Sequence, residues 1–354
     1  MMKHNFSAGP CILPREVIER AASAVLDFNE SGLSLIEISH RSKDFVAVMD
    51  KAQSLALKLL GLENKGYKAL FLQGGASLQF TMVPMNLFQK SAAYLDTGTW
   101  STKAIEEARR MGTTHVMATS ADQGYRYIPE EFVVPQGVDY IHYTSNNTIY
   151  GTQMTQFPKS DAPLVCDMSS DIFSRQLDFE QFDLIYAGAQ KNMGPAGATL
   201  VVVKESILKK EKGSLPAMLD YQAHIKGESM YNTPSVFAVY VSMLTLDWLD
   251  RQGGIAQIEP KNREKGRVMY EAIDKSELFE GYAHTKDRSL MNATFNLKRP
   301  ELTERFNKLL QEAGIEGLAG HRSVGGYRAS MYNALPLSSV HALAEVMSYL
   351  EQKG

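Results

Sequence analysis

The sequence predicts an α/β protein with a mainly parallel β-sheet and a second, smaller α+β domain. Short apolar runs of strand length alternate with amphipathic helical segments as far as Gln252, a pattern typical of parallel strands joined by helices. Beyond Gly254 the pattern changes to long helices with isolated strands between them, which is typical of an α+β domain. With 354 residues, 44% of them hydrophobic, the chain has enough material for both domains.

Seven apolar runs are the expected strands of the larger domain. Polar residues and glycines separate them, and helical periodicity occurs between them. After Thr102, for example, apolar residues recur at Ile105, Ala108 and Met111, and Gly112 ends the predicted helix. The runs cover residues 68–73, 92–96, 114–118, 139–144, 163–168, 183–189 and 198–203. In a sheet of this kind, ligands bind beyond the carboxyl ends of the strands.

The smaller domain is expected to combine long helices with a few strands. Predicted helices cover residues 255–275, 301–313 and 338–350, and predicted strands cover residues 290–297 and 326–332. The sequence contains neither an internal repeat nor a low-complexity segment.

Composition and charge argue against several classes of protein. A net charge of −3 argues against a nucleic-acid-binding protein, which normally has a basic face. The longest apolar run, residues 196–203, is too short to span a membrane. Because the N-terminus lacks an apolar leader and only Cys11 and Cys166 are present, we expect a cytoplasmic protein without disulfides. Neither cysteine has metal-ligand spacing, so both should be buried apolar residues and no metal site is expected.

Two residues of opposite charge end neighbouring predicted strands. Asp167 lies at the carboxyl end of one run, Lys191 follows the next, and a Gly-rich turn, LQGGASLQF, follows an earlier strand. Each element alone also fits a helix cap, a surface lysine or an ordinary turn. Together they match the needs of pyridoxal 5'-phosphate: a lysine for its aldehyde, an aspartate for its ring nitrogen and helix N-terminal amides for its phosphate. The constellation therefore predicts this cofactor.

Six segments carry a resemblance to a known family: HNFSAGPCILP, EISHRSKDF, LQGGASLQF, IYAGAQKNMGPAG, YNTPSVFAVY and GHRSVGGYRASMYNA. They resemble the motifs of the phosphoserine aminotransferases, class V members of the fold type I pyridoxal phosphate enzymes. The resemblance runs from Asn5 to the last helix. It implies a large domain, residues 15–254, with a mainly parallel seven-stranded sheet. It also implies a small domain made of residues 1–14 and 255–354.

The resemblance implies three catalytic residues. Lys191 binds the cofactor covalently and moves protons, Asp167 pairs with the ring nitrogen, and Trp100 stacks on the ring. We expect Trp100 in a loop after a strand, where a ligand would bind, although a core position would also suit a tryptophan.

Further cofactor contacts follow from the same resemblance. Thr148 binds the phenolic oxygen of the ring, although a turn hydroxyl would also fit its sequence context. Many relatives carry Gly-Arg where this chain has Ala76-Ser77, so we expect backbone amides to provide most of the phosphate binding. The residues expected at the phosphate are Ala76, Ser77 and Gln190, with Asn232 and Thr233 from a neighbouring subunit. Thr233 also fits a helix N-cap before Pro234.

Cationic side chains inside these motifs predict a doubly anionic substrate. His40 and Arg41 form one His-Arg pair, His321 and Arg322 form another, and Arg328 follows on a predicted strand. Such focusing of positive charge suits phosphoserine and glutamate, since each has an α-carboxylate and a distal anion. The resemblance assigns Arg328 to the α-carboxylate and the two pairs to the distal group. It also adds Ser7 to the substrate-binding residues.

The expected reaction transfers an amino group between glutamate and 3-phosphohydroxypyruvate, giving O-phosphoserine and 2-oxoglutarate in a homodimer with shared active sites. Some relatives also use 4-phosphohydroxythreonine in pyridoxine biosynthesis. A class V aminotransferase for another small amino acid is the main alternative. A cysteine desulfurase would need a nucleophilic cysteine on a mobile loop, and a cofactor-binding regulator would need a nucleic-acid-binding module.

Overall fold

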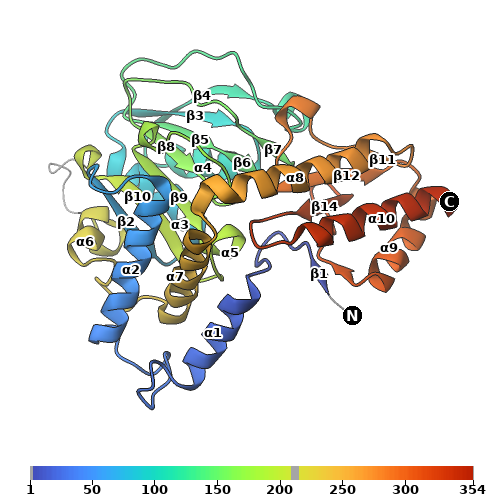
Figure 1. Cartoon of the computed structure of the whole chain (residues 1–354). Helices are drawn as coiled ribbons and strands as arrows, with labels where there is room; N and C mark the ends of the chain where they lie inside the picture. The colour runs from blue at the N-terminus through green and yellow to red at the C-terminus, as the bar shows by residue number, and fades with distance from the viewer. Residues whose placement is uncertain (1–2, 209–214, 354) are drawn as a thin grey trace.

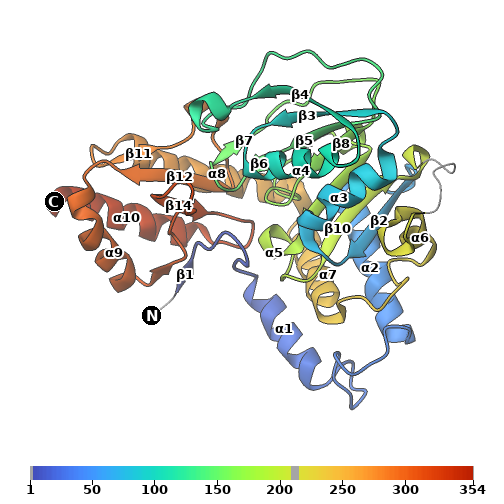
Figure 2. The same ribbon diagram turned by 180° about the vertical axis from the view of Figure 1, so that it is seen from behind.

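The computed structural model describes residues 3–208 and 215–353 (Figure 1). Residues 1–2, 209–214 and 354, which the predicted domains include, lie outside the described residues. A large sheet with helices on both faces forms one side of the molecule, and a smaller sheet with its own helices forms the other (Figures 1 and 2). None of the helices in residues 3–208 and 215–353 is long and apolar enough to cross a membrane.

The large sheet has seven strands in the order β2-β10-β9-β8-β5-β3-β4. Each of the seven predicted runs overlaps one of these strands. Only β10 is antiparallel to its neighbours, so the sheet is mainly parallel, as predicted. The strands are β2 (Tyr67–Leu72), β3 (Ser91–Asp96), β4 (Thr113–Thr119), β5 (Ile141–Thr144), β8 (Leu164–Asp167), β9 (Leu184–Gly188) and β10 (Thr199–Lys204).

Helices cover both faces of this sheet because successive side chains of a strand point to opposite faces. Cys166 and Ile185 pack with α1 (Arg15–Leu26), α2 (Lys43–Leu60) and α7 (Val236–Arg251) on one face. Val165 and Tyr186 pack with α3 (Gly75–Leu87), α4 (Thr99–Arg109) and α6 (Tyr221–Lys226) on the other. Cys166 is buried, as predicted, whereas Cys11 is only partly buried, so the prediction for Cys11 is not met.

Helix α4 begins earlier than predicted. The hydroxyl of Ser101 accepts hydrogen bonds from the backbone N–H groups of Thr97 and Gly98, both at 2.9 Å. This cap lets the helix begin at Thr99. The prediction that Trp100 lies in a loop is therefore wrong, because it lies in the first turn of α4.

The small sheet has the order β11-β12-β14, and α9 and α10 pack with it (Figure 1). Near the N-terminus, β1 (His4–Asn5) pairs in parallel with β13 (Ile315–Glu316), so the chain start lies with the small sheet. The other elements are β11 (Phe279–Gly281), β12 (Asn292–Leu297), β14 (Tyr327–Ser330), α9 (Thr303–Glu312) and α10 (Leu337–Lys353).

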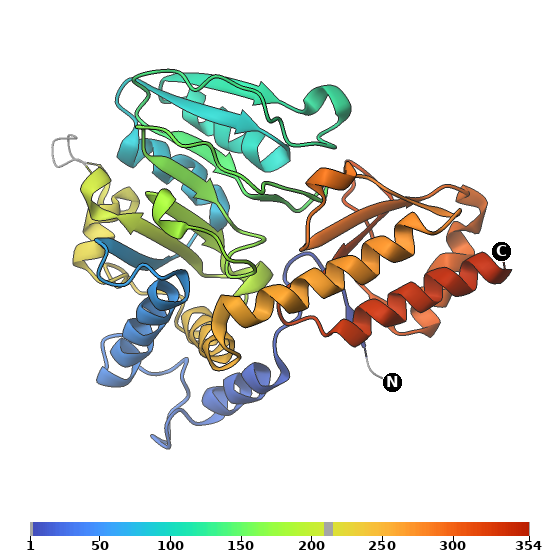
Figure 3. The same cartoon turned by 45° about the horizontal axis from the view of Figure 1, so that its top comes forward.

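Helix α8 (Gly254–Asp274) connects the two halves (Figure 3). Ile255 and Ile258 at its start pack with the core of the large sheet, whereas Val268 and Met269 pack with the small sheet. Apolar contacts therefore change from one core to the other inside a continuous helix. The division of the domains at residue 254 stays a prediction.

Short elements complete the described residues. A hairpin of β6 (Asn146–Asn147) and β7 (Thr152–Gln153) follows β5, and α5 (Ala189–Asn192) follows β9 directly. Single-turn 3₁₀ helices cover Ala121–Gln123, Phe179–Gln181, Glu205–Ile207, Ala217–Leu219, Thr285–Asp287 and Pro300–Leu302.

Candidate active site

Lys191 lies in α5, immediately beyond the carboxyl end of β9. Its Nζ donates a hydrogen bond to Oγ1 of Thr148 at 2.7 Å and lies 5.7 Å from the ring centroid of Trp100. Burial lowers the pKa of Lys191 to about 8; Asp167 opposes this shift and the positive charge of Arg328 adds to it. An amine with this pKa is partly neutral near pH 8, so it can act as a nucleophile or a base.

Asp167 ends β8, the strand next to β9. It is 4% exposed, and its Oδ1 accepts a hydrogen bond from the backbone N–H of Ser169 at 2.9 Å. Burial raises the pKa of Asp167, while hydrogen bonds from Ser169 and the charge of Lys191 act in the opposite direction. A cationic ring nitrogen beside this carboxylate would stabilise its ionised form. The site therefore fits the predicted partner of a pyridinium ring.

Trp100 lies where an aromatic cofactor beside Lys191 would contact its ring. Its Nε1 is buried and has no hydrogen-bond partner among the described residues. Such unpaired buried donors are uncommon in folded proteins. An unpartnered indole near the amine of Lys191 fits a ligand with acceptor oxygens.

The first turn of α3 forms the candidate phosphate site. Ala76 and Ser77 are its second and third residues, and no side chain caps the helix, whose N-cap is Gly74 with φ of 92°. The first N–H groups of a helix have no intrahelical acceptor and attract anions. The structure thus offers the two backbone amides that the sequence assigned to a phosphate.

Thr233 lies beside the turn that begins α3. Its carbonyl accepts a hydrogen bond from Nε2 of Gln73 at 2.8 Å and another from Nδ2 of Asn232 at 3.4 Å. It is not the N-cap of α7, because that position belongs to Ser235. Gln190 lies next to Lys191, and its carbonyl accepts from the N–H of Cys11 at 3.2 Å.

Cationic side chains from the small sheet lie near Lys191. Nη1 of Arg328, on β14, donates to the carbonyl of Thr148 at 3.2 Å. Burial lowers the pKa of His321, and the charges of Arg328, Arg322 and Lys103 lower it further. His321, Arg322 and Arg328 are therefore close enough to influence one another.

Lys103 was not singled out from the sequence. Its Nζ lies 4.9 Å from the ring centroid of Trp100. Trp100 precedes Lys103 by about one turn of α4. The i,i+3 spacing from Trp100 was the available signal, but it became usable only once α4 was known to begin at Thr99.

His40 and Arg41 do not join this cluster within one chain. They lie on the connection between α1 and α2, which Figures 1 and 2 place at the end of the molecule away from the small sheet. The expectation that both His-Arg pairs gather at one site is therefore not met by a single chain. The reason is that α1 runs away from β14, so the connection after α1 lies at a distance from that strand (Figures 1 and 2). Ser7 lies in the N-terminal segment, where its N–H donates to Oδ1 of Asn5 at 3.0 Å.

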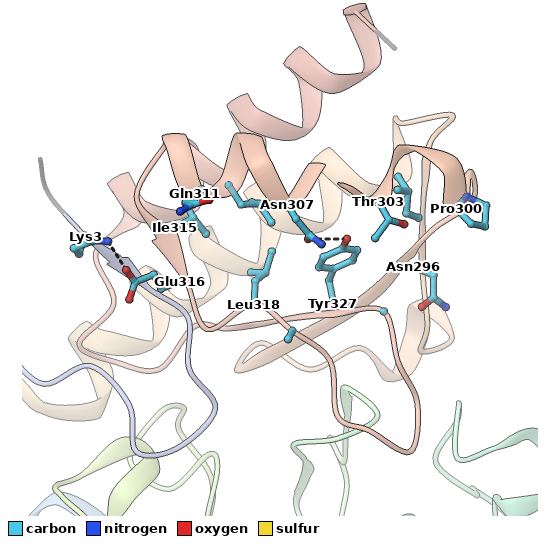
Figure 4. Close-up of a pocket in the computed structure, with 14 residues that line it drawn as sticks. Lys3, Asn296, Pro300, Thr303, Asn307, Gln311, Ile315, Glu316, Leu318 and Tyr327 are labelled. Carbon is cyan, nitrogen blue, oxygen red and sulfur yellow. Dashed lines mark hydrogen bonds and ion pairs between the residues drawn. The ribbon is translucent and has the colours of Figure 1, made fainter. Parts of the chain in front are cut away.

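A cavity of about 580 Å³ lies in the small domain, between α9 and the strands (Figure 4). Lys3 forms an ion pair with Glu316 there, and the hydroxyl of Tyr327 donates to Oδ1 of Asn307 at 3.1 Å. These polar side chains pair with one another, whereas Nε1 of Trp100 has no partner among the described residues.

Comparisons with known proteins point to one family. The family model for class V aminotransferases matches residues 3–343. The phosphoserine aminotransferase of Flavobacterium johnsoniae is 63% identical over 355 residues, and the match covers 100% of both chains.

Two solved structures are similar over nearly their full length. A phosphoserine aminotransferase described for radiation damage of its Schiff base has a TM-score of 0.97 at 47% identity, covering 100% of this chain and 99% of that chain. The phosphoserine aminotransferase of Trichomonas vaginalis with bound PLP has a TM-score of 0.93 at 36% identity, covering 98% of this chain and 100% of that chain. The predicted fold type I architecture is confirmed. The chain belongs to the class V aminotransferase family.

Proposed function

We propose that this chain transfers an amino group between glutamate and 3-phosphohydroxypyruvate, giving O-phosphoserine and 2-oxoglutarate, with pyridoxal 5'-phosphate as cofactor. The observation that carries the proposal is the contact of Lys191 with Thr148, beside Asp167, Trp100 and Arg328. Full-length relatives named phosphoserine aminotransferase support the same activity. The enzyme is thus a PLP-dependent aminotransferase of serine biosynthesis.

The residues at the carboxyl edge of the sheet suit this cofactor. Lys191 would bind its aldehyde, Asp167 its ring nitrogen and the amides of Ala76 and Ser77 its phosphate. When bound, the cofactor supplies an electron sink for the electron pair left when a proton leaves the substrate Cα. Lys191 takes that proton at Nζ, a task for which a pKa near 8 is suited at neutral pH.

Arg328 would orient the substrate. Its planar guanidinium can bind an α-carboxylate through two parallel hydrogen bonds, and its contact with Thr148 places it beside the amine of Lys191. His321 and Arg322 then remain for the distal phosphate or γ-carboxylate. Both anions of the substrate are thereby held with Cα directed toward Lys191.

We further propose a homodimer in which a second chain supplies His40 and Arg41. Large apolar side chains are exposed on the same connection and on α1: Leu26 is 83% exposed, Ile36 63% and Leu33 51%. Tyr231 and Phe237, near the start of α7, are also exposed. Exposed apolar groups of this kind mark interaction surfaces, and a two-fold axis would carry each connection to its partner.

The low cysteine count supports a cytoplasmic location, which we also propose. The chain has two cysteines, and both are free.

An amino-transfer assay with glutamate and 3-phosphohydroxypyruvate tests the activity directly. The purified protein should form O-phosphoserine, and glyoxylate should be a poor amino acceptor in its place. Borohydride reduction followed by mass spectrometry should add the cofactor mass to Lys191, and Lys191→Ala should lose that adduct. Lys204, a partly exposed lysine on neighbouring β10, offers a matched control through Lys204→Ala. Efficient transfer to glyoxylate without transfer to 3-phosphohydroxypyruvate would instead support another class V aminotransferase.

A further inference from the structure

Asn333 joins three separate parts of the chain at the boundary of the two domains. It follows β14, the strand that carries Arg328. Its backbone N–H donates to Oδ1 of Asn192 at 2.9 Å, and its Nδ2 donates to the carbonyl of Phe173 at 3.0 Å. Its Oδ1 accepts from Nδ2 of Asn262 at 2.8 Å. Since Asn333 is 7% exposed, water hardly competes for these bonds.

The partners of Asn333 are themselves anchored near the catalytic groups. Asn192 is the residue after Lys191, and its Nδ2 donates to the carbonyl of Ile172 at 2.6 Å. Asn262 lies in α8, is fully buried, and donates to the carbonyl of Ser174 at 2.9 Å. Asn333 therefore binds the lysine-bearing helix α5, the segment that follows Asp167 and the connecting helix α8.

Thr148 provides a second link between Lys191 and Arg328. Its hydroxyl accepts from Nζ of Lys191 at 2.7 Å, and its carbonyl accepts from Nη1 of Arg328 at 3.2 Å. The amine and the guanidinium are thus connected twice, once through Thr148 and once through Asn192 and Asn333. Such a closed ring restricts relative movement more than either link alone.

Lys265 of α8 binds the segment between Arg328 and Asn333. Its Nζ donates to the carbonyls of Met331 at 2.9 Å and Tyr332 at 2.7 Å, the two residues before Asn333. The backbone between Arg328 and Asn333 is therefore held by buried polar contacts along its length.

We propose that Asn333 is a positioning residue for amino transfer. It fixes the guanidinium of Arg328 relative to the amine of Lys191, so that an α-carboxylate on Arg328 presents its Cα to Lys191. Asn333 does not touch the substrate and acts through Asn192 and β14. The inference rests on the roles proposed above for Lys191 and Arg328. A misplacement of about 1 Å at a reacting centre can cost on the order of 100-fold in rate, so a small shift of β14 would be measurable.

The test compares Asn333→Ala with Asn86→Ala in the holoenzyme. Asn86 is also 7% exposed. Its Nδ2 donates to the carbonyls of Met82 at 2.8 Å and Leu219 at 2.7 Å, and its Oδ1 accepts from the N–H of Tyr221 at 3.0 Å. Asn86 therefore matches Asn333 in burial and bonding but lies within the large domain alone.

Asn333→Ala should lower kcat/KM for glutamate and for phosphoserine by the same factor, about tenfold or more. The visible absorption of the cofactor bound to Lys191 should titrate at higher pH, because the positive charge of Arg328 would lie farther from it. Asn86→Ala should lose thermal stability, with both kcat/KM values within about twofold of wild type. Should Asn333→Ala not fold, Asn262→Ala removes one of the same bonds and should act in the same direction.

The positioning role would be overturned if Asn333→Ala, like Asn86→Ala, kept the wild-type kcat/KM values and the wild-type titration of the cofactor absorption. A change for only one of the two substrates would overturn it as well, because both share the α-carboxylate. An inactive wild type would instead refute the proposed function, so the two failures are distinguishable.

Discussion

Lys265→Met should make the stability of this protein less dependent on pH. Lys265 is 2% exposed, and its Nζ donates only to the carbonyls of Met331 and Tyr332 among the described residues. A neutral amine has two N–H donors, so these two acceptors satisfy it without a charge. Burial lowers the pKa of Lys265 from 10.5 to about 7, and the positive charge of Lys261 adds to this shift.

The sign follows from the protons that each state binds. Between the folded pKa of about 7 and the unfolded pKa of 10.5, Lys265 of the unfolded chain keeps a proton that the folded chain has lost. The free energy of unfolding therefore rises with pH. Below about pH 6 both states are protonated, and Lys265 contributes no slope. For a folded pKa of about 7 and an unfolded pKa of 10.5, the rise between about pH 7 and pH 9 is about 2 kcal/mol.

Urea unfolding of the holoenzyme measures this contribution at fixed protein and cofactor concentrations. The free energy of unfolding of wild type minus that of Lys265→Met should rise by about 2 kcal/mol from about pH 7 to pH 9. Lys298→Met, at an exposed position after β12 that does not influence Lys265, is the control and should keep the wild-type slope. A wild-type-minus-variant difference that stays constant over this range would refute the argument.

Three further predictions concern binding, assembly and stability. Arg322→Ala should lower kcat/KM for phosphoserine more than for glutamate, by a factor equivalent to about 1 to 3 kcal/mol, because a phosphate offers more charge and more acceptors. Arg328→Ala should lower kcat/KM equally for both substrates. Equal losses for Arg322→Ala would show that Arg322 does not bind the phosphate. Mixing Lys191→Ala subunits with Asn232→Ala subunits should restore about one intact site per mixed dimer; absence of any recovery would place Asn232 at its own chain's phosphate. Gly151→Ala should destabilise the fold by about 1 to 3 kcal/mol in thermal unfolding, because φ is +75° and the new Cβ would lie 2.8 Å from the carbonyl of Asn292; an unchanged melting temperature would contradict this.

Local pattern was sufficient to place the two residues of opposite charge at strand ends. Asp167 and Lys191 could be placed at the carboxyl ends of strands because strand ends follow from the length of an apolar run and from the residues that interrupt it. The start of α4 was less accessible. Ser101 caps it as the third residue of the helix, whereas a serine just before a predicted helix is ordinarily expected to be its N-cap.

The sequence gives no sign that certain polar residues are buried in contacts between the domains. Asn333, Asn262 and Lys265 look like exposed residues in the sequence, because their types are usually exposed. They are buried because each finds backbone or side-chain partners far away in the chain. Those partners exist only after the two sheets have packed against α8.

The alternation of side chains along the chain was enough to predict the α/β class, the seven strands of the large sheet and their carboxyl ends to within one residue. The structure confirms that β8 lies next to β9, which brings Asp167 beside Lys191, but the order of the other strands came from the tertiary structure alone. It also decided that Thr148 bridges Lys191 and Arg328, and that the connection carrying His40 lies away from the small sheet in one chain (Figures 1 and 2). The physical reason is that such contacts join residues remote in sequence, and only packing of the whole core fixes their distances.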